Sequence, residues 1–243
     1  MFKIGSCRID SQPYLFNHVH NTKQILITLN YLLKNENREL YDNIHMKPLS
    51  MNVINIIRNK LINSKKVIIE ISSLKVWTDL NNMEIHWGKT KTIPNNINVI
   101  SKEDFLNDLK SITKLLKDKK VILVSHINID KNNYNEEIEC NGSTRWISNR
   151  FNDKNERKNT NDKIVIKVTT ASSKKIKNRD LIEKYIDEFI INKNIQHFKP
   201  YDYIKNNYVK DIESFFEKNN NSIDTNHYSL FGKTKIFTYL NQL

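Results

Sequence analysis

Cysteine, glycine and proline are scarce in this chain, and long apolar runs are absent. The two cysteines, Cys7 and Cys140, are too few for a disulfide framework. Nowhere do about eighteen apolar residues follow one another, so no transmembrane helix is expected. No signal-peptide-like apolar region precedes residues 1–5, which already have the pattern of a strand. We therefore expect a cytoplasmic protein in a reducing compartment, with no membrane partner.

Glycine and proline occur only four times each in 243 residues, whereas asparagine, isoleucine and lysine are abundant. This bias is typical of AT-rich genomes, such as those of giant DNA viruses and of some protists and bacteria. It contributes to a formal net charge of +12 at neutral pH. Part of the surface lysine content therefore reflects mutational drift.

A strongly basic chain can bind nucleic acid, which is one alternative for its function. The lysines, however, are scattered over predicted helix ends and turns. The sequence has no zinc-finger spacing, no aromatic-rich strand and no recognition-helix signature. Nucleic acid is therefore not the expected partner, and an anionic sugar or a phosphate-bearing substrate explains the charge at least as well.

Apolar periodicity predicts strands that alternate with helices. Short apolar runs predict strands at 2–6, 67–71, 121–124 and 196–198, and helical spacing predicts helices at 22–34, 50–63, 102–116, 180–191 and 230–240. Asn21 or Thr22 is the expected cap of the first helix, and Ser101 that of the third. This alternation predicts an α/β fold with a parallel sheet and helices on both faces. We expect a single domain over residues 1–243.

Two segments interrupt the alternation, residues 75–99 and residues 127–169. In the second, strand-like stretches at 144–151 and 163–169 flank a polar low-complexity run, which predicts a β-hairpin with a disordered tip. Both insertions follow strands, and there they are either tolerated rim loops or a substrate lid. In a lid, aromatic and basic side chains would hold a sugar; the candidates are Trp77, Trp87, Arg145 and Trp146.

Polar side chains follow the predicted strands at the edge where ligands bind in open parallel sheets. Ser6, Ser72, Ser73 and His126 all come just after a strand. His18 and His20 also form a spaced pair, but no carboxylate or cysteine accompanies them, so no metal site is expected. The rim thus predicts a polar ligand site that needs neither a metal nor a cofactor.

The two ends of the chain carry the most informative motifs. Gly5-Ser6-Cys7-Arg8 ends the first strand, and Asp224-Thr225-Asn226-His227 is expected on the loop before the last helix. A serine hydroxyl needs a base to remove its proton, and an imidazole oriented by a carboxylate is such a base. Cys7 is the alternative nucleophile, since Arg8 would lower the pKa of its thiol. Side chains alternate along a strand, so only one of the two can face the base, and position favours Ser6.

These motifs resemble those of the SGNH (GDSL-type) hydrolase superfamily, in particular its branch with a Gly-Ser-Cys first block (GSCFA-like). The resemblance implies a three-layer α/β/α sandwich of flavodoxin type, with Ser6 as nucleophile, His227 as base and Asp224 as its partner. It implies a serine esterase or an O-acyltransferase that acts on a small acyl group, such as an acetyl group on a carbohydrate. Arg8, His126, Trp77 and Arg145 are then expected to contact the substrate.

The sequence departs from the family at the oxyanion hole. The family adds an asparagine side chain and a glycine amide to the amide of the nucleophile. Here Ser72 or Ser73 stands at the asparagine position, and residues 9–66 contain no glycine. The oxyanion donors expected from this chain are therefore the Ser6 amide with Ser72 or Ser73. The departure leaves a second alternative open, a catalytically inactive domain that binds a carbohydrate or a partner.

Overall fold

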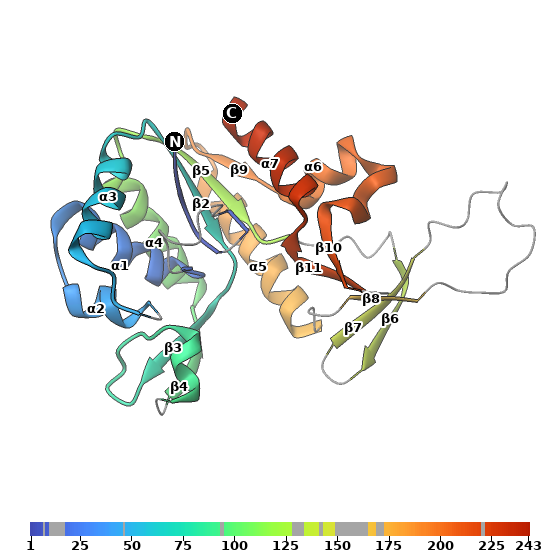
Figure 1. The fold of residues 1–243 in the computed structure, drawn as a ribbon, viewed down its shortest axis with the longest axis horizontal. Helices are drawn as coiled ribbons and strands as arrows, with labels where there is room; N and C mark the ends of the chain where they lie inside the picture. The colour runs from blue at the N-terminus through green and yellow to red at the C-terminus, as the bar shows by residue number, and fades with distance from the viewer. Residues whose placement is uncertain are drawn as a thin grey trace, which may run out of the picture. The chain divides into compact units, whose positions relative to one another are not determined.

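The computed structural model describes residues 1–6, 8–9, 18–45, 47–92, 95–127, 134–140, 143–148, 165–168, 173–219 and 222–243. The chain forms two compact units (Figure 1). Unit 1 comprises Met1–His126 and Leu181–Phe198, and unit 2 comprises Ile127–Asp180 and Lys199–Leu243. The boundary falls within helix α5 (Ser173–Ile190). Two compact units of one chain can still fold together as a single domain. The single domain with insertions at 75–99 and 127–169 therefore stays a prediction.

Unit 1 is built on a parallel sheet of four strands. These are β1 (Phe2–Ile4), β2 (Lys66–Ile71), β5 (Lys120–Ser125) and β9 (Gln196–Phe198), in the order β1-β2-β5-β9. Each neighbouring pair is parallel. All four strands were expected from their apolar runs, and the parallel sheet confirms the α/β class. The arrangement of helices and sheet in a three-layer α/β/α sandwich stays a proposal.

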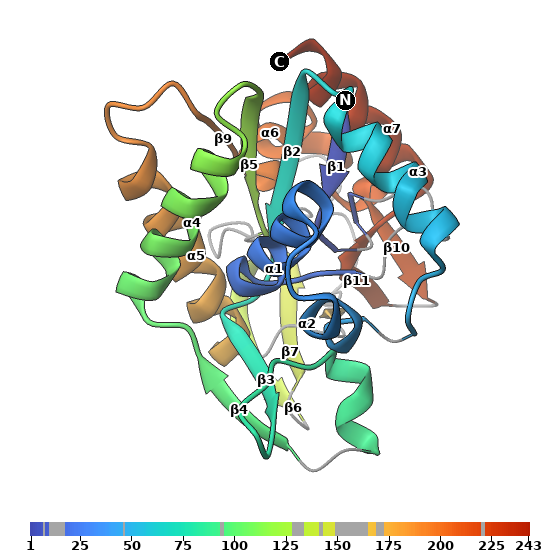
Figure 2. The ribbon, with the colours of Figure 1, turned by 90° about the vertical axis from the view of Figure 1, so that its left-hand side faces the viewer.

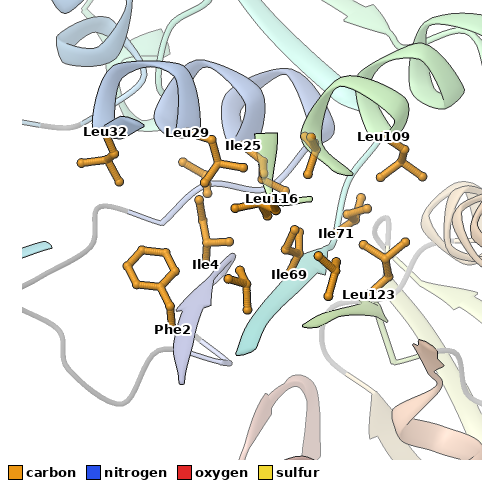
Figure 3. Close-up of a cluster of buried hydrophobic side chains, with 14 of the residues drawn as sticks. Phe2, Ile4, Ile25, Leu29, Leu32, Ile69, Ile71, Leu109, Leu116 and Leu123 are labelled. Atoms are coloured by element: carbon orange, nitrogen blue, oxygen red, sulfur yellow. The ribbon is translucent and has the colours of Figure 1, made fainter. Parts of the chain in front are cut away.

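Helices cover one face of this sheet (Figure 2). They are α1 (Thr22–Lys34), α3 (Met51–Ile62) and α4 (Lys102–Leu115). Figure 3 shows Ile25 and Leu29 of α1 beside Leu109 of α4, above Ile4 and Ile69 of the sheet, and all five are at most 2 % exposed. Burying each such side chain contributes roughly 1.5–3 kcal/mol. The apolar faces of these helices therefore fix them to the sheet.

Helices α1 and α4 begin where the sequence indicates, whereas α5 begins seven residues before the predicted start at residue 180. The Asn21 side chain accepts a hydrogen bond from the Gln24 amide at 2.8 Å, and the Ser101 hydroxyl accepts one from the Asp104 amide at 3.0 Å. A short helix, α2 (Arg38–Asn43), was not expected. The part of α5 in unit 1 packs beside α4, where the rings of Tyr185 and Phe105 meet edge to face.

The first predicted insertion forms an ordered substructure of unit 1 (Figure 2). Strands β3 (Lys75–Asp79) and β4 (Asn95–Val99) pair antiparallel, and the 3-10 helix η1 (Trp87–Lys91) lies between them in the chain. The segment is therefore a two-stranded sheet with its own hydrogen-bond ladder.

Unit 2 contains a five-stranded sheet in the order β10-β11-β8-β7-β6. Its strands are β6 (Tyr134–Cys140), β7 (Ser143–Ser148), β8 (Val165–Val168), β10 (Phe216–Asn219) and β11 (Ser222–Tyr228). The antiparallel pairing of β7 with β8 confirms the predicted hairpin, whose tip at 149–164 lies outside the described residues. Strands β6, β10 and β11 were not expected.

Three further helices lie in the described part of unit 2, besides the first residues of α5. These are α6 (Pro200–Asn207), the 3-10 helix η4 (Val209–Phe215) and α7 (Leu230–Gln242). Gly232 lets α7 approach η4 closely, because a Cβ at this position would lie 2.3 Å from the carbonyl oxygen of Phe215. The rings of Tyr203 and Tyr239 stack 4.5 Å apart. None of the helices in the described part of the chain is long and apolar enough to cross a bilayer.

Candidate functional site

The turn after β1 is held tightly against β2. Gly5 has a φ of +153°, and a Cβ at this position would lie 2.7 Å from the Cβ of Glu70. Glycine is thus the residue that this close approach admits. The Gly5 carbonyl accepts the Val19 amide at 3.1 Å, and the Ser6 carbonyl accepts the Ile9 amide at 3.2 Å. The backbone around Ser6 is therefore fixed on both sides.

Ser6 donates two hydrogen bonds to one oxygen of a buried carboxylate. Its amide lies 3.0 Å from Glu70 Oε2, and its hydroxyl donates to the same oxygen. The Arg8 guanidinium binds the other oxygen, with Nε 2.6 Å from Glu70 Oε1. Ser6, Arg8 and Glu70 are 0 %, 5 % and 1 % exposed. The expected nucleophile and an expected substrate contact thus share a buried ionic network in unit 1.

Sequence reasoning missed Glu70. The available signal was its position, since it is the only charged residue in the apolar run Val67–Ile71. A carboxylate in a strand that is buried on both faces requires a partner of opposite charge. Arg8 is that partner.

The two candidate oxyanion serines lie against His20. The carbonyl of His20 accepts the amides of Ser72 and Ser73, each at 2.9 Å. The hydroxyl of Ser72 lies 3.0 Å from His20 Nδ1, and the hydroxyl of Ser73 accepts the Lys75 amide at 2.9 Å. Burial, and then the nearby charge of Arg8, lower the pKa of His20 to about 3. A neutral imidazole can donate its Nδ1 proton to the oxygen of Ser72, and the hydroxyl proton of Ser72 is then available to another acceptor.

Further imidazoles are buried in the same unit. His45 is 2 % exposed, and neither of its ring nitrogens has a hydrogen-bond partner among the residues described. Burial lowers the pKa of His45 to about 3 and that of His86 to about 4. Burial acts in the opposite direction on Glu84, whose pKa it raises to about 7 although Asn21 donates to it at 2.9 Å. The three imidazoles of His20, His45 and His86 are therefore neutral at pH 7, whereas Glu84 takes up a proton as the pH falls through about 7.

These shifts predict acid sensitivity. The pKa values of the three histidines lie below the unfolded value of about 6.5, so as the pH falls from about 6.5 to about 4.5 the unfolded chain comes to bind up to three more protons through them. Glu84 opposes this by one proton, because its folded pKa is raised. A net uptake of about two protons on unfolding should make the free energy of unfolding fall by about 2.5 kcal/mol per pH unit on acidification.

Urea unfolding at pH 7, 6 and 5 measures this slope. In the His45→Phe variant the net proton uptake on unfolding should be smaller by about one proton, and the slope should be correspondingly shallower. A stability that is unchanged or greater at pH 5 would contradict the assignment of buried neutral imidazoles.

The remaining rim residues lie as follows. Ser6, Ser72 and His126 all follow the carboxyl ends of parallel strands in unit 1, and His126 is 5 % exposed. Trp77 lies on β3, partly buried, opposite Ile97 of β4. The backbone of Arg145 lies on β7 in unit 2. Its side chain lies outside the described part of the chain, as do Cys7 and the side chains of Trp87 and Trp146.

Unit 2 carries the expected Asp-His pair. His227 Nδ1 lies 2.6 Å from Asp224 Oδ2, with the imidazole 44 % exposed and the carboxylate 13 % exposed. The expected loop is wrong, because both residues belong to strand β11. The cap of the last helix is Ser229, which accepts the Gly232 amide at 3.1 Å.

A bulge brings the two side chains together. Residues three apart on a regular strand point to opposite faces. Here Glu217 of β10 pairs with Asp224, and the preceding Phe216 pairs with Tyr228, so residues 225–227 have no partner on β10. Bulges of this kind re-aim side chains. The bulge turns His227 back onto Asp224, and the carboxylate of Glu217 lies beside them with ligand atoms of all three within 4.8 Å of one another.

The candidate residues therefore fall into two groups, one in each unit. Ser6, Arg8 and Glu70 belong to unit 1, whereas Glu217, Asp224 and His227 belong to unit 2. A hydrogen bond between Ser6 and His227, as a triad requires, stays a prediction. Comparison with protein-family models and with curated proteins finds no match to this chain.

Proposed function

We propose that the protein is a serine esterase or O-acyltransferase of SGNH type that acts on a small acyl group, such as an acetyl group of a carbohydrate. The contact between Asp224 and His227 supports this most directly. A carboxylate that binds Nδ1 fixes the ring and its tautomer, and it stabilises the imidazolium formed during catalysis. Nε2 is then the nitrogen that takes the proton of the nucleophile.

In this mechanism the Ser6 oxygen attacks the acyl carbon while His227 takes the hydroxyl proton. His227 then returns the proton to the leaving alcohol as the acyl-enzyme forms. Water hydrolyses the acyl-enzyme in an esterase, and a sugar hydroxyl accepts the acyl group in a transferase. The developing oxyanion takes hydrogen bonds from the Ser6 amide and from the hydroxyl of Ser72 or Ser73.

Glu70 sets a condition on this chemistry. Its Oε2 accepts both the amide and the hydroxyl of Ser6. An oxyanion would take the same amide hydrogen bond, so Glu70 and a bound substrate compete for it. Catalysis therefore requires Ser6 to exchange its hydrogen bonds from Glu70 to the substrate and to His227.

The same observation favours a second function, that of a catalytically inactive domain that binds a carbohydrate or a partner. Ser6 is fully buried, and its hydroxyl satisfies an ionised side chain that Arg8 already pairs. A serine that hydrogen-bonds a buried ion pair stabilises the fold and need not take part in any reaction. The binding alternative predicts that Ser6→Ala retains ligand binding.

Labelling of the serine separates the two functions. The wild type and Ser6→Ala are incubated with p-nitrophenyl acetate and butyrate and with a fluorophosphonate probe, while circular dichroism confirms the fold. Turnover and labelling that are lost in Ser6→Ala but kept in Cys7→Ser establish Ser6 as the nucleophile. A folded wild type with neither turnover nor labelling refutes the esterase, and an inactive Cys7→Ser moves the nucleophile to Cys7.

A further inference from the structure

Two carboxylates face each other on adjacent strands of unit 2. Glu217 of β10 and Asp224 of β11 are direct register partners in an antiparallel pair. Like charges in this position destabilise a strand pair, unless a positive charge lies between them. The bulge at residues 225–227 places the imidazole of His227 next to both. The ligand atoms of these three side chains lie close enough together to share a metal ion. Among the residues described, no other group of three or more carboxylate, imidazole or thiol side chains does so.

The donor set selects the kind of cation. Two carboxylate oxygens and one imidazole nitrogen suit Zn²⁺ and similar transition metals, whereas Mg²⁺ and Ca²⁺ prefer oxygen ligands throughout. Around a tetrahedral ion with bonds of about 2.0–2.1 Å, ligand atoms lie roughly 3.4 Å apart. The Asp224–His227 contact of 2.6 Å must open by less than an ångström, and Glu217 is exposed and can approach.

We propose that Glu217, Asp224 and His227 bind one divalent transition-metal ion of the Zn²⁺ type. Three protein ligands leave a coordination position for water, as in sites that are not purely structural. All three ligands belong to unit 2, so the site does not depend on Ser6. It shares His227 and Asp224 with the proposed hydrolase, however. Metal and proton compete for the imidazole lone pair, so the metal-bound form cannot use His227 as a base.

Calorimetric titration with ZnCl₂ tests the site in the full-length, metal-stripped protein. The wild type should bind one ion per chain, and Glu217→Gln should bind it at least about tenfold more weakly. Glu213→Gln is the matched control, because Glu213 is a nearby carboxylate of unit 2 that pairs with Lys218 at 3.5 Å and lies outside the group. Its affinity should equal that of the wild type. No binding by the wild type, or equal affinity in Glu217→Gln, would overturn the proposal.

The same variant separates this proposal from the proposed function. Glu217→Gln keeps the Asp224–His227 pair, so its ester hydrolysis should equal that of the metal-free wild type. If the protein hydrolyses esters, inhibition of Glu217→Gln should need a Zn²⁺ concentration at least about tenfold higher than inhibition of the wild type. Metal binding without ester hydrolysis refutes only the hydrolase, and hydrolysis without metal binding refutes only the metal site.

Discussion

Replacing His227 with alanine should lower the kcat for hydrolysis of a small aryl ester by about 10²–10⁴-fold, which is the usual contribution of a general base. The imidazole is oriented by Asp224 at 2.6 Å, so Asp224→Asn should also lose activity, because the amide stabilises the wrong tautomer. Initial rates with p-nitrophenyl acetate over a range of pH measure both effects.

The chain offers a matched control for this prediction. His197 also contacts a carboxylate through Nδ1, at 2.8 Å from Asp187 Oδ1, but its side chain is 2 % exposed, against 44 % for His227, and the proposed mechanism gives it no role. His197→Gln should therefore leave kcat and the pH profile unchanged in a folded protein. A His227→Ala protein that keeps wild-type kcat would refute the assigned base, whatever the outcome for Ser6.

Replacing Glu70 with alanine should destabilise the protein by about 3–5 kcal/mol, because it leaves the buried guanidinium of Arg8 without its counter-ion. The amide and the hydroxyl of Ser6 lose their acceptor in the same variant. With Arg8 at 5 % exposure and Ser6 at 0 %, water does not readily replace these interactions. The shift in the urea midpoint, read by circular dichroism at pH 7, measures the loss.

A double replacement isolates the ion pair. Removing both charges, in Glu70→Gln combined with Arg8→Met, should be markedly less destabilising than removing Glu70 alone, because no unpaired charge stays buried. A loss of less than about 1 kcal/mol in Glu70→Ala would mean that the network contributes little, since surface pairs typically contribute that much.

The core of unit 1 is predictable from sequence because its signals are local. Val121–Val124 is an uninterrupted apolar run and Val67–Ile71 is apolar except for Glu70, while the side chains of Asn21 and Ser101 cap helices through neighbouring amides. Each such element forms from residues that are adjacent in the chain. The strands then run parallel to one another, because crossover connections that contain helices join them.

Strands β10 and β11 escape prediction for the opposite reason. Phe216–Asn219 is short and mostly polar, and Ser222–Tyr228 contains a bulge that removes its alternation. Their pairing depends on contacts across the sheet. The sequence therefore indicates the Asp224–His227 pair but neither its strand nor the neighbouring Glu217. The network of Ser6 with Glu70 escapes likewise, because the two residues are 64 positions apart.

The close approach of Gly5 to Glu70 also bears on how relatives of this chain can be recognised. Every residue except glycine has a Cβ, so Gly5 is required whatever side chain stands at position 70, whereas Arg8 and Glu70 neutralise each other and cannot change independently. In divergent descendants, Gly5 should be kept, and Arg8 and Glu70 should be kept together or lost together. A search pattern made of Gly-Ser-x-Arg at the end of one buried strand and a lone glutamate in the next should thus detect distant homologues that overall similarity misses.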